Sequence, residues 1–235
     1  MLRKSIKFVD KSIDRIVIIV SLLFFLICIY AMIDAVMVYY NANDQSVLKY
    51  KPHGKEDASM LQNLSKDAVA WLTVDGTNID YPVMQGKTNS EYLNKNPYGD
   101  YSLSGSIFLD SRCDGKFKDA YSLLYGHHMD YGSMFGALDE FIKPKYFYTH
   151  RTGKLITTDG DEYSITFFAA AKAPADEDIV FDPPHTTNKK LLKYLKSKAA
   201  VFEKPRDSEH FIALSTCQSA ANIERMLVFG ELTPR

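Results

Sequence analysis

The chain has 235 residues and is almost neutral, with 28 lysine and arginine residues against 29 aspartate and glutamate residues. Hydrophobic residues make up 46% of the sequence, which suits one domain with a sizeable core, and the balanced charge gives no basic footprint for nucleic acid. Three cysteines, one of them in an apolar N-terminal stretch, can build neither a disulfide framework nor a zinc quartet.

The N-terminus has the pattern of a membrane anchor. Residues 1–15 are short and basic, and residues 16–38 are apolar, with no formal charge before Asp34. Such a stretch is long enough to span a bilayer. Because positive charge precedes the span and is nearly absent after it until Lys49, we expect a single-pass cell-membrane protein with a cytoplasmic N-terminus. A cleaved signal peptide is the alternative, although its apolar region would ordinarily have only about 7–15 residues.

Residues 39–55 contain Pro52 and Gly54, which indicates a stalk or linker before a domain over residues 56–235. From Glu56 to Val69 the apolar residues fit a helical stripe. Short strand-like runs then follow, separated by Gly, Asp and Asn turns, at residues 71–74, 79–83, 106–109, 121–125, 154–157 and 162–170. Many short strands at this spacing favour a mainly β fold, as a barrel or a sandwich.

Residues 173–205 interrupt the β pattern. A loop rich in proline and acidic residues comes first, and residues 186–200 then carry Leu191, Leu192 and Leu195 on one face of an expected helix. The lysines of this helix are interpreted as its solvated face. The acidic run 176–178 lacks the spacing of a calcium loop, so we expect no metal there.

Two apolar runs near the C-terminus, residues 211–214 and 226–229, also read as strands. Cys217 lies just after the first run, where a rigid sheet can hold a side chain that opens into a cleft, as a catalytic thiol requires. If the two strands pair antiparallel through residues 218–224, the guanidinium of Arg225 returns alongside the sulfur.

A thiol nucleophile needs a base, and the run YGHHM supplies His127 and His128 directly after a glycine. A nearby imidazole can take the thiol proton and later return it to a leaving amine. Taken singly, a buried cysteine is more often an inert hydrophobe and paired loop histidines are more often solvated. Adjacent side chains on an extended segment point apart, so only one of the two histidines can face Cys217.

The run LSTC, with an arginine eight residues after its cysteine and YGHHM upstream, resembles the sortase family and looks closest to class B. Residues 71–85, 92–94 and 104–110 also look like the class B pattern, and the resemblance covers about residues 56–235. It implies a sortase-type closed β-barrel with N-terminal helices and a helix, inserted before the cysteine strand, that walls the substrate groove. One departure is Ala213, where many members have threonine.

The resemblance also implies an activity, that of a membrane-anchored cysteine transpeptidase acting on surface proteins with a C-terminal sorting signal. Cys217 would cleave after threonine through a thioester, His127 would act as acid and base, and Arg225 would hold the oxyanion. The acceptor amine would come from cell-wall peptidoglycan or, in a pilus-polymerising relative, from a protein lysine. No metal or organic cofactor is required.

Substrate contacts are predicted at Leu214, Ser215 and Thr216, although a structural role for the Ser215 hydroxyl is an equal alternative. Other protein classes remain open. An L,D-transpeptidase places His-Gly before its cysteine, where this chain has Ser215 and Thr216. An extracytoplasmic cysteine endopeptidase would share the Cys–His pair but hydrolyse the thioester, and a membrane-anchored binding module would have an unreactive thiol.

Overall fold

The computed structural model describes residues 2–206, 209–216 and 224–235, with side chains from residue 11 onward. Cys217, the expected nucleophile, therefore lies outside the described residues. The chain divides into two compact units, Met1–Asn41 and Ala42–Arg235.

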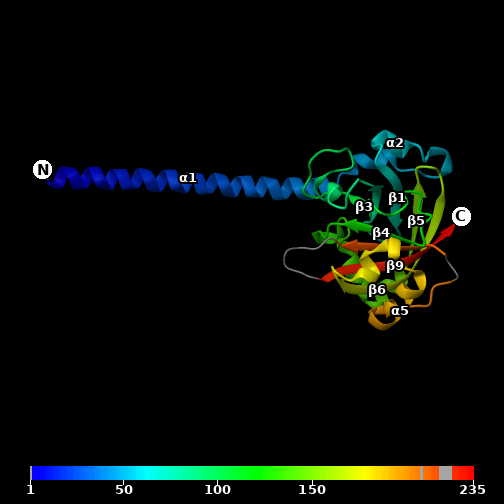
Figure 1. Ribbon diagram of the computed structural model, residues 1–235. Coiled ribbons are helices and arrows are strands. Elements are labelled where there is room, and N and C mark those ends of the chain that lie inside the picture. Colours follow the sequence, from blue (N-terminus) through cyan, green and yellow to red (C-terminus); the bar gives the residue numbers. More distant parts are fainter. Residues whose placement is uncertain (1, 207–208, 217–223) are drawn as a thin grey trace. The chain divides into compact units, whose positions relative to one another are not determined.

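The first unit consists of helix α1 (Leu2–Ala42), drawn in blue in Figure 1. Its apolar side chains between Ile16 and Tyr40 are exposed, and an 18-residue window reaches a mean hydropathy of 3.1 with none of that window buried. By length and composition this helix can cross a membrane, and a signal sequence would have the same properties. The structure thus contains the apolar N-terminal helix that the sequence predicts.

The second unit is built on one sheet. Its strands, within the described residues, are β1 (Ala68–Val74), β2 (Asp80–Met84), β3 (Ile107–Leu109), β4 (Tyr121–Gly126), β5 (Thr152–Thr157), β6 (Glu162–Pro174), β7 (Val201–Phe202), β8 (Phe211–Thr216) and β9 (Glu224–Pro234). They follow the order β5-β1-β2-β3-β4-β8-β9-β6-β7, and β6 also pairs with β5. This extra pairing closes eight strands into a barrel, so the expected closed β-barrel is confirmed and the sandwich alternative is not.

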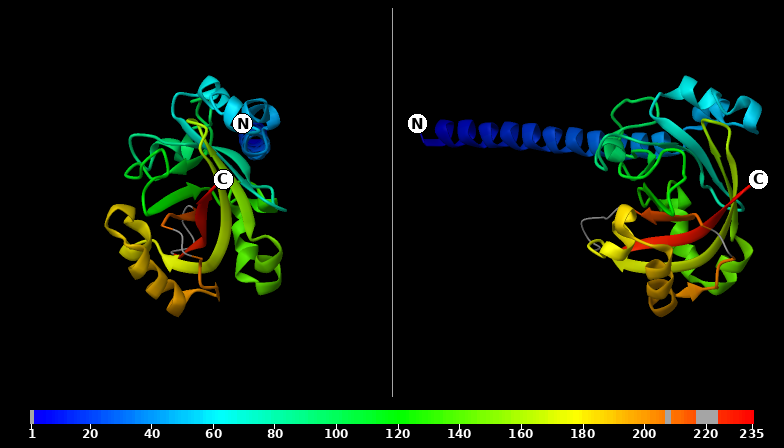
Figure 2. Two further views of the ribbon diagram at one scale, coloured as in Figure 1. Left: turned by 90° about the vertical axis from the view of Figure 1, so that its right-hand side faces the viewer. Right: turned by 45° about the vertical axis from the view of Figure 1, so that its right-hand side comes forward.

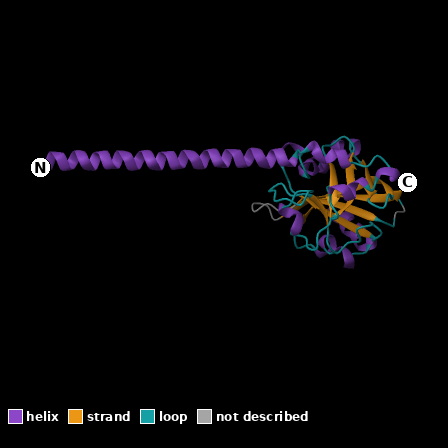
Figure 3. Cartoon of the chain, turned by 90° about the horizontal axis from the view of Figure 1, so that it is seen from above, coloured by secondary structure: helices purple, strands orange, loops and turns teal. Residues whose placement is uncertain are grey.

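Helices surround the strands, as Figure 3 shows. They are η1 (Gln45–Tyr50), η2 (Lys55–Asp57), α2 (Met60–Leu64), η3 (Glu91–Asn94), η4 (Asp130–Gly132), η5 (Gly136–Ile142), α3 (Pro144–Thr149), α4 (Asp178–Phe181), η6 (Pro183–His185) and α5 (Asn188–Lys198), where η marks a 3-10 helix. The helix expected before the cysteine strand is α5. It begins at the N-cap Thr187, whose hydroxyl oxygen accepts a hydrogen bond from the Lys190 amide.

Both faces of the central strands are buried, as β8 illustrates. Phe211 and Ala213 belong to one hydrophobic cluster, whereas Ile212 and Leu214 belong to another. Side chains alternate along a strand, so each face needs its own cover. Residues of η5 and α3 pack in the cluster of Ile212, and residues of α2 and α5 pack in the cluster of Phe211.

The sequence misplaced two boundaries. The helical stripe expected from Glu56 to Val69 is shorter, because α2 ends at Leu64 and residues 68 and 69 already belong to β1, where Ala68 pairs with Met84. Sheet pairing overrides the local helical pattern there. The long strand β6 continues to Pro174 alongside β9 (Figure 2, yellow and red), and the short strand β7 was not predicted.

Candidate active site

Three neighbouring strands bring the predicted catalytic residues to one edge of the barrel. Strand β4 runs parallel to β8, and Gly126, the last residue of β4, pairs with Thr216, the last residue of β8. His127 follows Gly126, and Cys217 follows Thr216 in the sequence. Strand β9 runs antiparallel to β8, as the sequence predicted, and Arg225 lies near its start.

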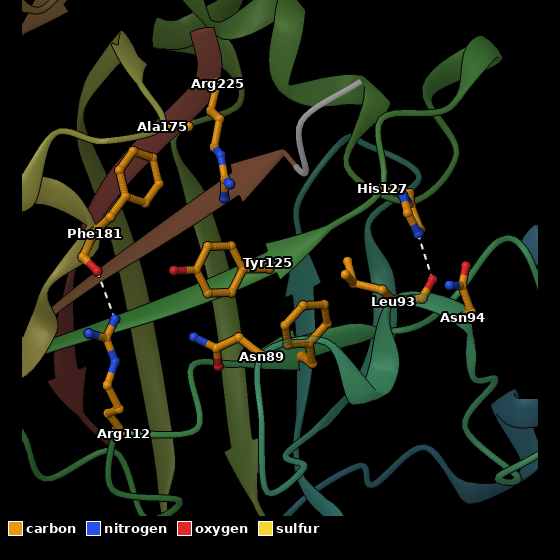
Figure 4. Close-up of a pocket in the computed structure, with 10 residues that line it drawn as sticks. Asn89, Leu93, Asn94, Arg112, Tyr125, His127, Ala175, Phe181 and Arg225 are labelled. Carbon is orange, nitrogen blue, oxygen red and sulfur yellow. Dashed lines mark hydrogen bonds between the residues drawn. The ribbon is translucent and has the colours of Figure 1, made fainter. Parts of the chain in front are cut away.

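A cavity of about 580 Å³ opens at this edge, and His127 and Arg225 both line it (Figure 4). Leu93 and Asn94 of η3 contribute to one side, and Phe181 of α4 contributes to another. Two of the three residues predicted to be catalytic therefore share one cavity, which lies where β8 leads to the third.

The orientation of His127 is set by a main-chain group. Its Nε2 atom lies 2.6 Å from the carbonyl oxygen of Leu93. A carbonyl oxygen only accepts hydrogen bonds, so Nε2 is the donor. In the neutral imidazole the lone pair is then on Nδ1, which makes no hydrogen bond to the described residues. His127 is thus held in the tautomer whose free base is Nδ1.

A glycine makes this contact possible. Gly105 has a φ of +60°, and a Cβ atom there would lie 2.5 Å from the Leu93 oxygen, 2.7 Å from the Tyr92 oxygen and 3.0 Å from Cδ2 of His127. The turn that contains Gly105 is held against Tyr92, whose carbonyl accepts a 3.0 Å hydrogen bond from the Ser106 amide. Only glycine combines this backbone conformation with such a close approach.

His128 has different surroundings. Its side chain is exposed, and its Nε2 atom lies 2.8 Å from Oδ2 of Asp139 in η5. It does not line the cavity that His127 and Arg225 share. The structure separates the two neighbouring histidines, as expected for adjacent residues of an extended segment.

Arg225 enters the cavity between two aromatic rings. Its guanidinium carbon lies 4.9 Å from the ring centroid of Phe181 and 5.8 Å from that of Tyr125. Its Nε atom is buried and has no hydrogen-bond partner among the described residues. A buried donor without a partner is costly, so this nitrogen is suited to a carbonyl or oxyanion brought by a substrate.

The three residues predicted to contact substrate lie within β8 and do not line the cavity. The side chain of Leu214 is fully buried in the core, so its role is packing and the prediction for it is corrected. The Ser215 hydroxyl is also buried and donates to the Thr216 carbonyl at 3.1 Å. Thr216 Oγ1 accepts a 3.0 Å hydrogen bond from the Met226 amide, which ties β8 to β9.

Sequence reasoning missed several cavity residues, notably Asn89, Arg112, Tyr125 and Phe181. They come from separate segments, and no spacing connects them. One local signal was present, because Asp110 and Arg112 stand two residues apart just after a strand, which is typical of an ion pair in a turn. No group of three or more His, Cys, Asp or Glu side chains in the described parts of the chain is arranged to hold a metal ion.

Comparison with known proteins places these features in a family. A family model described as "Sortase domain" matches residues 72–233. Sortase B of Listeria monocytogenes is 31% identical over 208 residues, which cover 86% of this chain and 83% of that protein. Sortase B of Staphylococcus aureus is 29% identical over 178 residues, which cover 73% of this chain and 72% of the relative.

Solved structures agree with the sequence comparisons. A Streptococcus pyogenes class B sortase involved in pilus biogenesis is 38% identical and has a TM-score of 0.68, over 74% of this chain and 96% of the other. The Staphylococcus aureus sortase B–substrate complex is 27% identical and has a TM-score of 0.70, over 80% of this chain and 89% of the other. The described barrel is therefore the fold of class B sortases.

Proposed function

The chain belongs to the sortase family, and from that membership we propose that it is a membrane-anchored class B cysteine transpeptidase. It would cleave a C-terminal sorting signal after threonine and join the protein to a cell-wall peptidoglycan amine. The observation that supports this proposal most directly is the shared cavity of His127 and Arg225, at the edge where β8 leads to Cys217.

In the proposed reaction the Cys217 sulfur attacks the threonine carbonyl of the sorting signal. His127 gives a proton to the leaving amine, and the acyl group stays on the sulfur as a thioester. The incoming amine then loses its proton to His127 as it attacks the thioester, which restores the thiol–imidazole pair. Because Leu93 accepts the Nε2 proton, Nδ1 is the nitrogen that exchanges these protons.

Arg225 would stabilise the oxyanion of the two tetrahedral intermediates. Its Nε donor has no partner in the described part of the chain, and charge-assisted hydrogen bonds to an oxyanion form most strongly in the transition state. In comparable sites, loss of such a donor costs roughly 3–4 kcal/mol of transition-state stabilisation. Phe181 and Tyr125 would hold the guanidinium over the reacting carbonyl.

A pilus-polymerising activity is the second candidate for the acceptor step. The Streptococcus pyogenes protein that resembles this chain at 38% identity is described as involved in pilus biogenesis. A Staphylococcus aureus sortase B structure, 27% identical, is described as a complex with triglycine. A protein lysine and a peptidoglycan cross-bridge amine are chemically alike as nucleophiles, so the choice between them is left to experiment.

Mass spectrometry of peptide products tests the proposal. The protein is incubated with LPxTG-, NPxTN- and PxTG-like peptides, with and without triglycine, and with Cys217→Ala as the control. We expect cleavage after threonine and a triglycine adduct that the control lacks. Hydrolysis that triglycine leaves unchanged would point to an endopeptidase, and no cleavage of any peptide would argue against the whole proposal.

We further propose that α1 anchors the protein, with residues 1–15 cytoplasmic, residues 16–38 in the membrane, residues 39–55 as a stalk and residues 56–235 as the extracytoplasmic catalytic domain. The apolar helix and the basic charge before it support this topology. The compact unit begins earlier, at Ala42, and Val47 of η1 is already buried. Part of the proposed stalk therefore packs with the domain.

A further inference from the structure

A second arginine, Arg112, lines the cavity, and its hydrogen bonds are nearly saturated. Its Nε donates to Oδ1 of Asp110 at 2.9 Å, and its Nη2 donates to Oδ2 of Asp110 at 2.9 Å and to the Phe181 carbonyl at 2.7 Å. Its Nη1 donates to Oδ1 of Asp182 at 3.1 Å. Four of its five N–H groups are engaged, so this arginine is poorly suited to hold a substrate.

The anchor of Arg112 is a buried carboxylate. Asp110 is fully buried, and it also accepts hydrogen bonds from Asn89 Nδ2 at 2.8 Å and from the Tyr125 hydroxyl at 3.1 Å. Burial by itself would raise the pKa of Asp110, but the hydrogen bonds and charge of Arg112 outweigh it and hold that pKa below its ordinary value. The carboxylate is therefore charged at neutral pH, and the ion pair is fixed to the β3–β4 side of the barrel.

The other end of the network is short helix α4. Four residues are too few for a stable isolated helix, and the last carbonyls of any helix lack internal partners. Arg112 supplies a donor to one of these carbonyls, that of Phe181, and its positive charge is favourable at a helix C-terminus. The position of α4 thus depends on a contact from a segment that is distant in the sequence.

The network reaches Arg225 through two aromatic rings. Phe181 carries the ring that lies 4.9 Å from the Arg225 guanidinium carbon, and its carbonyl is the group that Arg112 holds (Figure 4). Tyr125 carries the second ring, 5.8 Å away, and its hydroxyl donates to Asp110. Both rings that contact Arg225 are therefore fixed by the Asp110–Arg112 pair.

We propose that Arg112 is a positioning residue for the reaction: it holds Phe181 so that the rings of Phe181 and Tyr125 orient the guanidinium of Arg225 toward the reacting carbonyl. The inference rests on the proposed oxyanion role of Arg225. Arg225 has no hydrogen bond from Nε to the described residues, so these ring contacts are the interactions available to orient it before substrate arrives.

Hydrogen exchange of the full chain in detergent micelles tests the structural half without any substrate. The amides of Val180 and Phe181 both donate to the Glu177 carbonyl within α4. Arg112→Lys keeps the charge but loses the fork, and we expect about tenfold faster exchange at these amides, with no change in β8. Arg151→Lys, at an arginine paired with Glu203 away from the cavity, is the matched control and should leave α4 exchange unchanged.

A double-mutant cycle on kcat/KM tests the catalytic half. Arg112→Lys should lower kcat/KM about tenfold, mainly through kcat, because it acts on the orientation of Arg225. In an Arg225→Lys background the same change should cost less than about twofold, since the oriented fork is already lost. The milder Asp182→Ala removes only the Nη1 contact and should give a smaller change in the same direction.

The outcomes separate the two proposals. Unchanged exchange in α4, or kinetic losses from Arg112→Lys and Arg225→Lys that multiply, would overturn the positioning role. A wild-type protein that cleaves no sorting peptide would overturn the proposed function instead, and the exchange result would still decide whether Arg112 holds α4.

Discussion

The Nε2 atom of His127 lies 2.6 Å from the main-chain oxygen of Leu93, on the wall of the cavity that Arg225 also enters. The acceptor belongs to the backbone, so no side-chain substitution at residue 93 removes it. The base nitrogen of His127 is consequently set by how η3 and the Gly105 turn pack together. This relationship links the backbone of one segment to the proton transfers proposed for another.

The two histidines should differ in activity. His127→Ala removes the proposed acid and base and should lower kcat/KM for peptide cleavage by about 10³-fold. His128→Ala removes only an exposed pair with Asp139 and should cost less than about tenfold. Both variants need the circular dichroism of the wild type, and equal losses in the two would reject the assignment.

Gly105→Ala should impair both stability and catalysis. A left-handed non-glycine residue costs about 1–3 kcal/mol, and the added Cβ would also push against the Leu93 oxygen and His127. We expect a lower melting temperature and a loss of about tenfold or more in kcat. Gly99→Ala is the matched control, because Gly99 has a φ of +96° but nothing within 4 Å of an added Cβ. If both variants lose kcat equally, displacement of the histidine is not the cause.

Arg225→Lys should fail to restore activity even though it keeps the charge. Lysine is a compact point charge without the planar fork, so it cannot reproduce directional hydrogen bonds to an oxyanion. We expect kcat/KM about 10²-fold below wild type, near the value of Arg225→Ala. The pH dependence of Cys217 alkylation provides the contrast, because a purely electrostatic role in favouring the thiolate would survive in the lysine variant together with turnover.

Only one thiol of the domain should react near neutral pH. Cys113 is buried and free, and its burial raises the pKa of the thiol to about 12. Only roughly one molecule in 10⁵ then carries the Cys113 thiolate at pH 7, and this fraction rises as the pH approaches the raised pKa. In a Cys28→Ala background, iodoacetamide should add one label per folded chain, and a further Cys217→Ala change should abolish it. Labelling of Cys113 in the folded protein would contradict this expectation.

The topology can be tested on intact cells. Because positive charge precedes the apolar helix, added protease should digest the chain after Tyr40 and spare an epitope placed within residues 1–15. Immunoblotting for that epitope and for the C-terminal domain measures both parts in one sample. Protection of the C-terminal domain would exclude the proposed orientation, and loss of the N-terminal epitope before protease addition would indicate cleavage of the anchor.

Local sequence patterns predicted most of the strands and α5, because alternation and helical spacing are recorded within a few residues. The same patterns misjudged Leu214. The LSTC motif indicates where a functional segment lies, but the exposure of each side chain depends on what packs against the strand, and the core encloses Leu214.

The sequence by itself determined the residue types of the candidate site, the apolar N-terminal helix and the antiparallel return of β9 beside β8. Only the tertiary structure decided that β4 lies parallel to β8, which places His127 at the edge where β8 ends, and that Arg112 reaches Phe181 across the cavity. The physical reason is that neighbours in a barrel are chosen by long-range hydrogen bonding and packing. These energies depend on the whole chain and leave no periodic trace in any one segment.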